Sequence, residues 1–269
     1  MPFACFVLST GRCGTQSLAR VFSLAAGDRA VVEHEPLEGE YVPRKALAWS
    51  RQPDPAPESI PLAVAEHLDD IESILARQSY VECGHPSWST IPYLLRHFAG
   101  RVRVIHLIRH PAAVAFSWVT HRAYRPPLES HFPERVLLTP FDAGVLHPEY
   151  QSRWNNLSPH EKALYYWLEV NAFGVALQRK AHVPWLTVRF EDFVTGAANH
   201  DLAQFLDLDE FRGAPPHVDR HRFRSEVPWD EVGITEHPAV AALAERFGYD
   251  LDSIDRESLR DRYLGSTRS

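Results

Sequence analysis

The feature that most constrains the fold is a short apolar run, residues 3–8, followed at once by a turn with two glycines and an amphipathic segment. A continuous apolar run of this length is typical of a strand buried on both faces, as in a parallel sheet. Residues 9–15 form the turn, with Gly11 and Gly14, and residues 16–24 have the apolar spacing of a helix. A strand, a glycine turn and a helix in this order indicate an α/β fold.

Short apolar and longer amphipathic segments continue to alternate along the chain. Further strands are predicted at residues 29–33, 80–83, 102–108 and 185–190. Helices are predicted at residues 60–78, 89–99, 112–121, 159–182 and 199–206, with Asn199 as the cap of the helix at 199–206, and a last helix begins near Pro238. Two stretches that contain several prolines, residues 36–60 and 123–157, are predicted to be irregular. This order favours a three-layer α/β/α fold with a mostly parallel central sheet. We expect a single domain over residues 1–269.

Residues that can carry chemistry follow the first four predicted strands. Arg12, Glu35, His85 and Arg109 each come shortly after the end of a different strand. The carboxyl ends of parallel strands lie at one edge of the sheet, and ligands of such sheets bind there. We therefore expect the site at this edge.

The turn itself is a candidate for binding an oxyanion, and we interpret it as a P-loop-like phosphate-binding turn. Successive backbone N–H groups with a helix N-terminus behind them form a cradle for a negative charge. Gly11 and Gly14 let the backbone approach an anion closely, and Arg12 and Thr15 add a charge and a hydroxyl. The alternative is a tight strand-to-helix turn without a ligand.

The residues around the turn narrow the choice of anion. A P-loop of nucleoside triphosphatases needs Gly-Lys followed by Ser or Thr, with the hydroxyl on Mg²⁺, whereas Gly14 is followed here by Thr15 and Gln16. A phosphatase loop needs five residues between Cys and Arg, and six lie between Cys13 and Arg20. His217 and His221 have i, i+4 spacing but follow the loop-like residues 214–216, and no HExxH or CxxC motif is present, so no metal is expected.

The turn resembles that of the PAPS-dependent sulfotransferases, whose Lys/Arg-Ser-Gly-Thr loop holds the 5′-phosphosulfate of 3′-phosphoadenosine 5′-phosphosulfate (PAPS). Residues 12–15 match this loop, with Cys13 where Ser is usual. The family's 3′-phosphate site has a strand that ends in Arg and a Ser eight residues later, as Arg109 and Ser117 do here. Ser117 is expected on the sheet-facing stripe of its helix, where a hydroxyl needs a partner. A phosphate shared with Arg109 would supply one, and a bond to the carbonyl of residue 113 is the alternative.

The resemblance to the family covers roughly residues 3–230, with weaker similarities beyond the two motifs above. Residues 165–171 and 185–193 resemble segments that we interpret mainly as scaffold. Arg222 and Arg224 lie in a stretch that resembles the C-terminal basic loop closing on the 3′-phosphate, although the usual Lys-Gly is missing and either Arg fits. The likeness is thinnest at about 36–75 and 123–157, the variable segments where acceptor recognition would lie.

The resemblance implies transfer of a sulfuryl group from PAPS to a hydroxyl or amine of a small molecule or glycan, with PAP as product. Positioning and electrostatics would carry most of the catalysis, with Arg12 at the leaving oxygen. Glu35 resembles the base of glycan sulfotransferases and His85 that of small-molecule ones, and we favour Glu35. The residues expected to bind the donor are Gly11, Arg12, Cys13, Gly14, Thr15, Gln16, Arg109, Ser117, Arg222 and Arg224. The alternatives are a P-loop-like phosphotransferase and a non-catalytic protein that binds PAP or another nucleotide.

Composition excludes other classes of partner. The chain has 28 Lys and Arg against 35 Asp and Glu, a formal net charge of −7, which argues against a nucleic-acid or basic membrane-surface protein. Three cysteines in 269 residues do not form a disulfide scaffold, which indicates a reducing compartment. With no targeting segment recognised and no apolar run of about 20 residues, we expect a cytoplasmic protein. Oligomeric state is not indicated.

Overall fold

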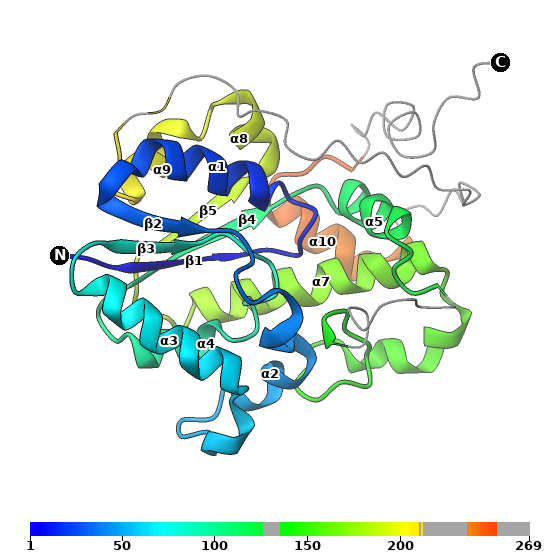
Figure 1. The fold of residues 1–269 in the computed structure, drawn as a ribbon. Coiled ribbons are helices and arrows are strands. Elements are labelled where there is room, and N and C mark those ends of the chain that lie inside the picture. The colour runs from blue at the N-terminus through cyan, green and yellow to red at the C-terminus, as the bar shows by residue number, and fades with distance from the viewer. Residues whose placement is uncertain (126–134, 210, 212–235, 252–269) are drawn as a thin grey trace.

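The computed structural model describes residues 1–125, 135–209, 211 and 236–251. In this part of the chain, five parallel strands form one sheet in the order β2-β3-β1-β4-β5 (Figure 1). The strands are β1 (Ala4–Leu8), β2 (Ala30–Glu33), β3 (Ser79–Glu82), β4 (Val102–Ile108) and β5 (Trp185–Arg189). Both β1 and the expected parallel sheet are confirmed, and the continuous apolar run of β1 is fully buried because helices cover both faces.

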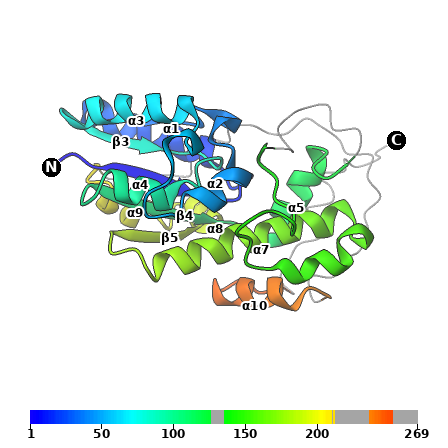
Figure 2. The same ribbon diagram turned by 90° about the horizontal axis from the view of Figure 1, so that it is seen from below.

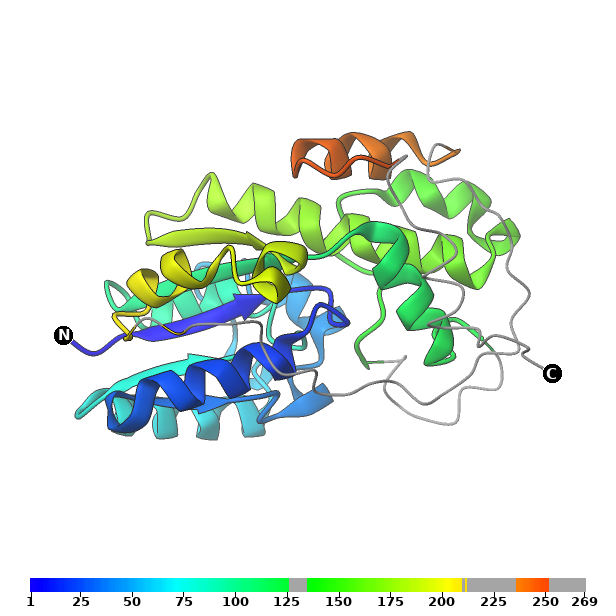
Figure 3. The same ribbon diagram turned by 90° about the horizontal axis from the view of Figure 1, so that it is seen from above.

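Helices cover the sheet on two sides, which confirms the three layers (Figure 1, Figure 2). On one face lie α1 (Thr15–Ala26), α8 (Phe190–Thr195) and α9 (Asn199–Phe205), as the view from that side shows (Figure 3). On the other face lie α3 (Leu62–Leu75), α4 (Ile91–His97) and α7 (Pro159–Gln178). Beyond the strand ends, α5 (Pro111–Thr120) packs on α7, and α10 (Pro238–Arg246) lies on the outer side of α7.

Local signals in the sequence explain where the helices near the site begin. Pro111 is the first residue of α5, where its missing N–H costs no hydrogen bond. The α7 helix begins after Ser158, which accepts a hydrogen bond from the amide of Glu161, while the Glu161 carboxylate accepts one from the amide of Ser158. These starts direct α5 and α7 past the carboxyl edge of the sheet.

Several boundaries differ from the prediction. The segment 36–60, expected to be irregular, contains η2 (Glu38–Tyr41), α2 (Pro43–Trp49) and η3 (Pro57–Ser59), because Pro43 and Pro57 begin helices rather than interrupt them. Residues 148–156 of the second irregular stretch form η4 (Pro148–Asn156). Asn199 was expected to cap α9, but Ala198 occupies the cap, and α7 ends four residues earlier than predicted.

None of the described helices is long and apolar enough to cross a membrane. Within the same residues, no group of three His, Cys, Asp or Glu side chains is arranged to hold a metal ion. The assignment of residues 1–269 to a single domain stays a prediction.

Candidate functional site

The parallel sheet brings the four predicted strand-end residues to one edge. Arg12 follows β1, Glu35 follows β2, His85 follows β3 and Arg109 follows β4, and these four strands are neighbours in the sheet. The strand ends lie next to α5 and the start of α1 (Figure 1). This is the edge at which ligands of open α/β sheets bind.

The glycine turn (residues 9–15) is shaped by left-handed backbone. Gly11, Arg12 and Gly14 have φ of 69°, 58° and 79°. A Cβ on Gly14 would lie 2.6 Å from Cε2 of Phe190, and one on Gly11 would lie 2.8 Å from Cγ of His85. Both glycines are therefore needed for conformation and for space. Arg12 has no such freedom, and a non-glycine residue in this region stores strain of the kind found at binding sites.

Side chains of the protein hold three carbonyl groups of the turn. The Trp118 indole donates to the carbonyl of Thr10 at 3.2 Å, and Arg109 Nη1 donates to the carbonyl of Arg12 at 2.7 Å. The carbonyl of Gly11 accepts from the Thr10 hydroxyl at 2.9 Å. With the carbonyls held in this way, the negative ends of these peptide dipoles are neutralised by protein donors.

The amides that follow have no such partners. In the described part of the chain, no hydrogen-bond acceptor lies opposite the backbone N–H groups of residues 13–17, and no side chain caps the N-terminus of α1. The first helical turn carries no acidic residue. Gln16 contributes one of these amides, while its side chain is exposed. Uncapped amides and the positive end of the helix dipole favour an anion at this point.

Two arginines and a serine border the amides. Arg12 Nε donates to the hydroxyl of Ser117 on α5 at 2.9 Å, and both Arg109 and Ser117 are buried. The guanidinium of Arg109 stacks on the ring of Phe190 at 4.6 Å. The Trp167 indole donates to the carbonyl of Arg109 at 2.9 Å, which fits its expected role as scaffold. The described structure has no hydrogen bond from Ser117 to the carbonyl of residue 113.

The third residue of the turn with unusual surroundings is Cys13, whose side chain is buried. Its thiol is fully buried between the Thr10 hydroxyl and the carbonyl of Gly11, each at 3.2 Å. Burial raises its pKa to about 11. The thiol therefore shapes the turn and stays protonated.

Glu35 and His85 form a hydrogen-bonded pair. His85 Nδ1 lies 2.8 Å from Glu35 Oε1. Glu35 has φ of 49°, and a Cβ on Gly84 would lie 3.0 Å from Cγ and 3.2 Å from Cα of Glu35, which is tighter than an ordinary contact, so a glycine at this position favours the close approach of the two loops. Burial raises the pKa of the Glu35 carboxyl, but the charge and hydrogen bond of His85 outweigh this and lower it to about 2. The ionised carboxylate holds a proton on Nδ1 and directs Nε2 as the basic nitrogen.

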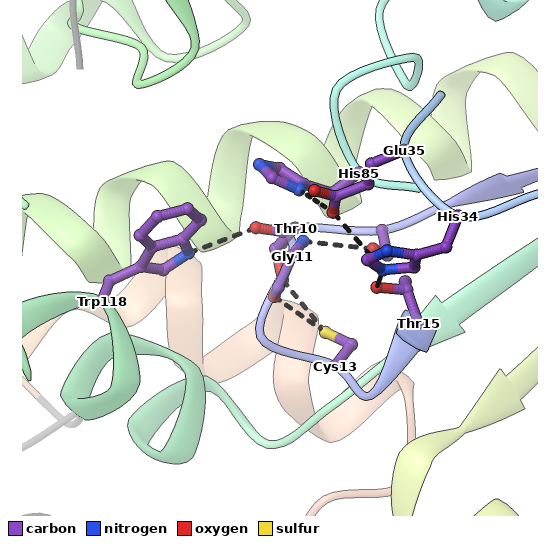
Figure 4. A network of polar contacts seen from close by, with 9 residues as sticks. Thr10, Gly11, Cys13, Thr15, His34, Glu35, His85 and Trp118 are labelled. Atoms are coloured by element: carbon purple, nitrogen blue, oxygen red, sulfur yellow. Dashed lines mark hydrogen bonds and ion pairs between the residues drawn. The ribbon is translucent and has the colours of Figure 1, made fainter. Parts of the chain in front are cut away.

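His34 links this pair to the turn (Figure 4). Its Nε2 lies 3.1 Å from the Thr15 hydroxyl and 3.8 Å from Glu35 Oε1. Burial lowers the pKa of His34, and the nearby Glu35 carboxylate only partly compensates. From the sequence, His34 ranked below Glu35 and His85 as a candidate for the base. Its position beside Glu35 in a strand end was the available signal.

Aromatic side chains cover the other side of His85. The Trp118 ring lies edge-on to His85 with centroids 5.6 Å apart, and Tyr166 on α7 lies edge-on to Trp118 at 5.9 Å. Tyr166 is fully buried. Phe190 and Tyr166, which the sequence analysis did not single out, thus border the site through packing alone. Arg222 and Arg224 lie outside the described residues.

Comparison with known proteins identifies solved structures that share the fold of this chain. No protein-family model matches the chain, and no curated protein does either. Solved structures match over nearly the whole chain. The sulfotransferase domain of the Synechococcus PCC 7002 olefin synthase is 18% identical with a TM-score of 0.52, covering 93% of this chain and 95% of that chain.

Two further structures agree with the first. The sulfotransferase domain from the curacin biosynthetic pathway is 15% identical with a TM-score of 0.54, covering 93% of this chain and 99% of its own. A sulfotransferase from Alicyclobacillus acidocaldarius is 19% identical with a TM-score of 0.53, covering 94% and 98%. At these identities the likeness concerns architecture, and the protein has the α/β fold of these sulfotransferase structures.

Proposed function

We propose that this protein is a PAPS-dependent sulfotransferase that acts on a hydroxyl or amine of a small molecule or glycan. The observation that carries the proposal is the run of amides at residues 13–17, which has no protein acceptor among the described residues and is bordered by Arg12 and Arg109. The fold it shares with the solved sulfotransferases supports the same reading.

The residues present fit an anionic donor. The amides of the glycine turn, the Thr15 hydroxyl and Arg12 would hold its 5′-phosphosulfate, and Arg109 with Ser117 its 3′-phosphate. Two guanidinium groups and several amides match the charge of such a nucleotide. PAPS supplies the sulfuryl group and a phosphate leaving group.

His85 is the better candidate for the base, which revises the preference for Glu35. The Glu35 carboxylate already accepts the hydrogen bond of His85, and this contact lowers its pKa and makes it the weaker base. Glu35 instead orients the imidazole through Nδ1, and Nε2 takes the proton of the acceptor. As that proton leaves, the acceptor oxygen or nitrogen bonds to sulfur and the bond from sulfur to the phosphate oxygen breaks. Arg12 and the turn amides stabilise the charge that develops on this oxygen.

A thermal-shift experiment tests the donor. PAP at 100 times its Kd is expected to raise the free energy of unfolding by about 2.7 kcal/mol, and the melting temperature by several degrees. Arg12→Ala should weaken this shift, whereas Arg20→Ala, at an exposed position on α1, should not. An equal shift with ATP–Mg²⁺, or none with PAP, would overturn the proposal in favour of a phosphotransferase or another ligand.

A further inference from the structure

His34 joins the two parts of the site but takes no part in the mechanism above. Its Nε2 faces the Thr15 hydroxyl at 3.1 Å on one side and the Glu35 carboxylate at 3.8 Å on the other. Glu35 in turn bonds to His85 at 2.8 Å. The chain Thr15–His34–Glu35–His85 therefore runs from the first residue of α1 to the candidate base, as Figure 4 shows.

The direction of the hydrogen bond between Thr15 and His34 depends on what else Thr15 contacts. A hydroxyl has one proton. When Thr15 donates this proton to an anion held by the turn, its oxygen presents only lone pairs to His34. At 3.1 Å the ring nitrogen must then carry a proton and donate to the Thr15 oxygen, because two facing lone pairs repel each other.

The proton on His34 Nε2 also interacts with the Glu35 carboxylate. A neutral imidazole with its proton on Nε2 presents the positive end of that N–H to the Thr15 oxygen and, at 3.8 Å, to the Glu35 carboxylate. In the other tautomer a lone pair would face the carboxylate. Burial disfavours the doubly protonated ring, so the choice is between two neutral tautomers. The Nε2–H tautomer attracts the Glu35 carboxylate and so stabilises its position. Because Glu35 is hydrogen-bonded to His85, this tautomer also stabilises the orientation of the His85 ring.

We propose that His34 is a positioning residue that couples occupancy of the glycine turn by an anionic donor to the orientation of the Glu35–His85 pair. Binding of the anion selects the Nε2–H tautomer of His34, and this tautomer fixes the carboxylate that orients the base. The proposal rests on the proposed function, because the anion in question is the phosphosulfate donor or its product PAP.

Nuclear magnetic resonance on the intact protein tests the tautomer directly. The ¹⁵N chemical shifts of the His34 ring, assigned by comparison with His34→Gln, distinguish Nε2–H from Nδ1–H with and without PAP. We expect the Nε2–H form in the PAP complex. A His34 ring that carries its proton on Nδ1 in that complex overturns the proposal, and this measurement needs no variant to be active.

A double-mutant cycle on PAP affinity provides the second test. Thr15→Val and His34→Leu should each weaken PAP binding by about tenfold, the scale of one hydrogen bond near a charge, and the double variant should be no weaker than Thr15→Val alone. His34→Gln places an amide N–H near the position of Nε2 and should restore most of the affinity and of kcat. His200→Leu, at an exposed position on α9, is the matched control and should bind like the wild type.

The outcomes separate this inference from the proposed function. If PAP binds the wild type but the two substitutions are additive, or if His34→Gln is no better than His34→Leu, the coupling is wrong and the donor assignment stands. If PAP does not bind the wild type, the proposed function fails and the coupling fails with it.

Discussion

Past the ends of β1 and β4 lie two arginines, of which Arg109 is held by the Arg12 carbonyl and the Phe190 ring, while Arg12 donates to Ser117 of α5. Past the ends of β2 and β3, by contrast, a carboxylate and an imidazole are held by a hydrogen bond to each other. We call the first group the anion half (residues 9–17, Arg109 and Ser117) and the second the base half (Glu35 and His85), with His34 between the two halves and in contact with both. Glu35 and His85 are fixed mainly by the hydrogen bond between their side chains.

This difference suggests that, at one edge of the sheet, separate groups of residues bind the anion and transfer the proton. Guanidinium groups keep their charge over the whole accessible pH range, so the anion half provides a constant positive field. The base half depends instead on where its proton lies, because Glu35 and His85 are joined by one hydrogen bond. Substitutions in the two halves should therefore have separable effects on donor affinity and on turnover.

The largest effect is expected in the base half. His85→Asn retains an amide that can donate to Glu35 but lacks Nε2, and kcat should fall by about 10²–10⁴-fold, the usual contribution of a general base. Steady-state kinetics with PAPS and an acceptor measure this. His200→Asn, an exposed histidine on α9, should leave kcat unchanged. Turnover of His85→Asn at the wild-type rate would remove His85 from the mechanism.

A substitution in the glycine turn of the anion half should lower the free energy of unfolding. Gly14→Ala adds a Cβ 2.6 Å from the Phe190 ring at a φ of 79°, and we expect the free energy of unfolding to fall by about 2–4 kcal/mol. Gly100→Ala is the matched control, because Gly100 has the same φ of 79° but nothing lies within 4 Å of its added Cβ. It should cost only about 1 kcal/mol. Equal losses in urea unfolding would show that Phe190 does not constrain the turn.

The sequence predicted the anion half better than the base half. Strand ends of a parallel sheet share an edge whatever the details of packing, so Arg12 and Arg109 could be placed together from the strand pattern alone. The pairing of Glu35 with His85 depends on a left-handed φ at Glu35 and on the close approach of Gly84. Neither feature has a local sequence signal, which is why the choice of base stayed open.

The packing of side chains around the turn could not be predicted from the sequence either. Phe190 touches both the Gly14 position and Arg109, yet it is 176 residues from the former and belongs to a segment that was interpreted as scaffold. The helix α2 was missed because its first residue, Pro43, is as common in loops as at helix starts. Contacts between distant segments, rather than secondary structure, account for most of what the sequence did not predict.

The base half should also show a pH-dependent contribution to stability. The Glu35 pKa lies at about 2 against an ordinary 4.5, so its stabilisation is complete above pH 4.5 and is lost as pH falls through 2. The difference in unfolding free energy between wild type and Glu35→Gln should shrink from at most about 3 kcal/mol at pH 6 to about 1 kcal/mol at pH 3. Urea unfolding at the two pH values measures it. A constant difference would mean that Glu35 and His85 do not share a proton in the folded state.

The smallest effect is expected at Cys13. With a pKa of about 11, roughly one thiol in a thousand is ionised at pH 8, and the group is buried. Iodoacetamide should label it only after unfolding in urea, and Cys13→Ser should change PAP affinity by less than about threefold. Mass spectrometry of native and unfolded protein reports the labelling. Rapid labelling of Cys13 in the native protein would contradict a buried, protonated thiol.

The division between the two halves is tested most directly by calorimetric titration of PAP into the wild type, Arg12→Ala and His85→Asn. The expected result is binding to the wild type, an affinity at least tenfold lower for Arg12→Ala, since a charged hydrogen-bonding group is lost, and an affinity within about twofold of the wild type for His85→Asn. Equal weakening in both variants, or no binding of PAP to the wild type, would contradict the separation of an anion half from a base half.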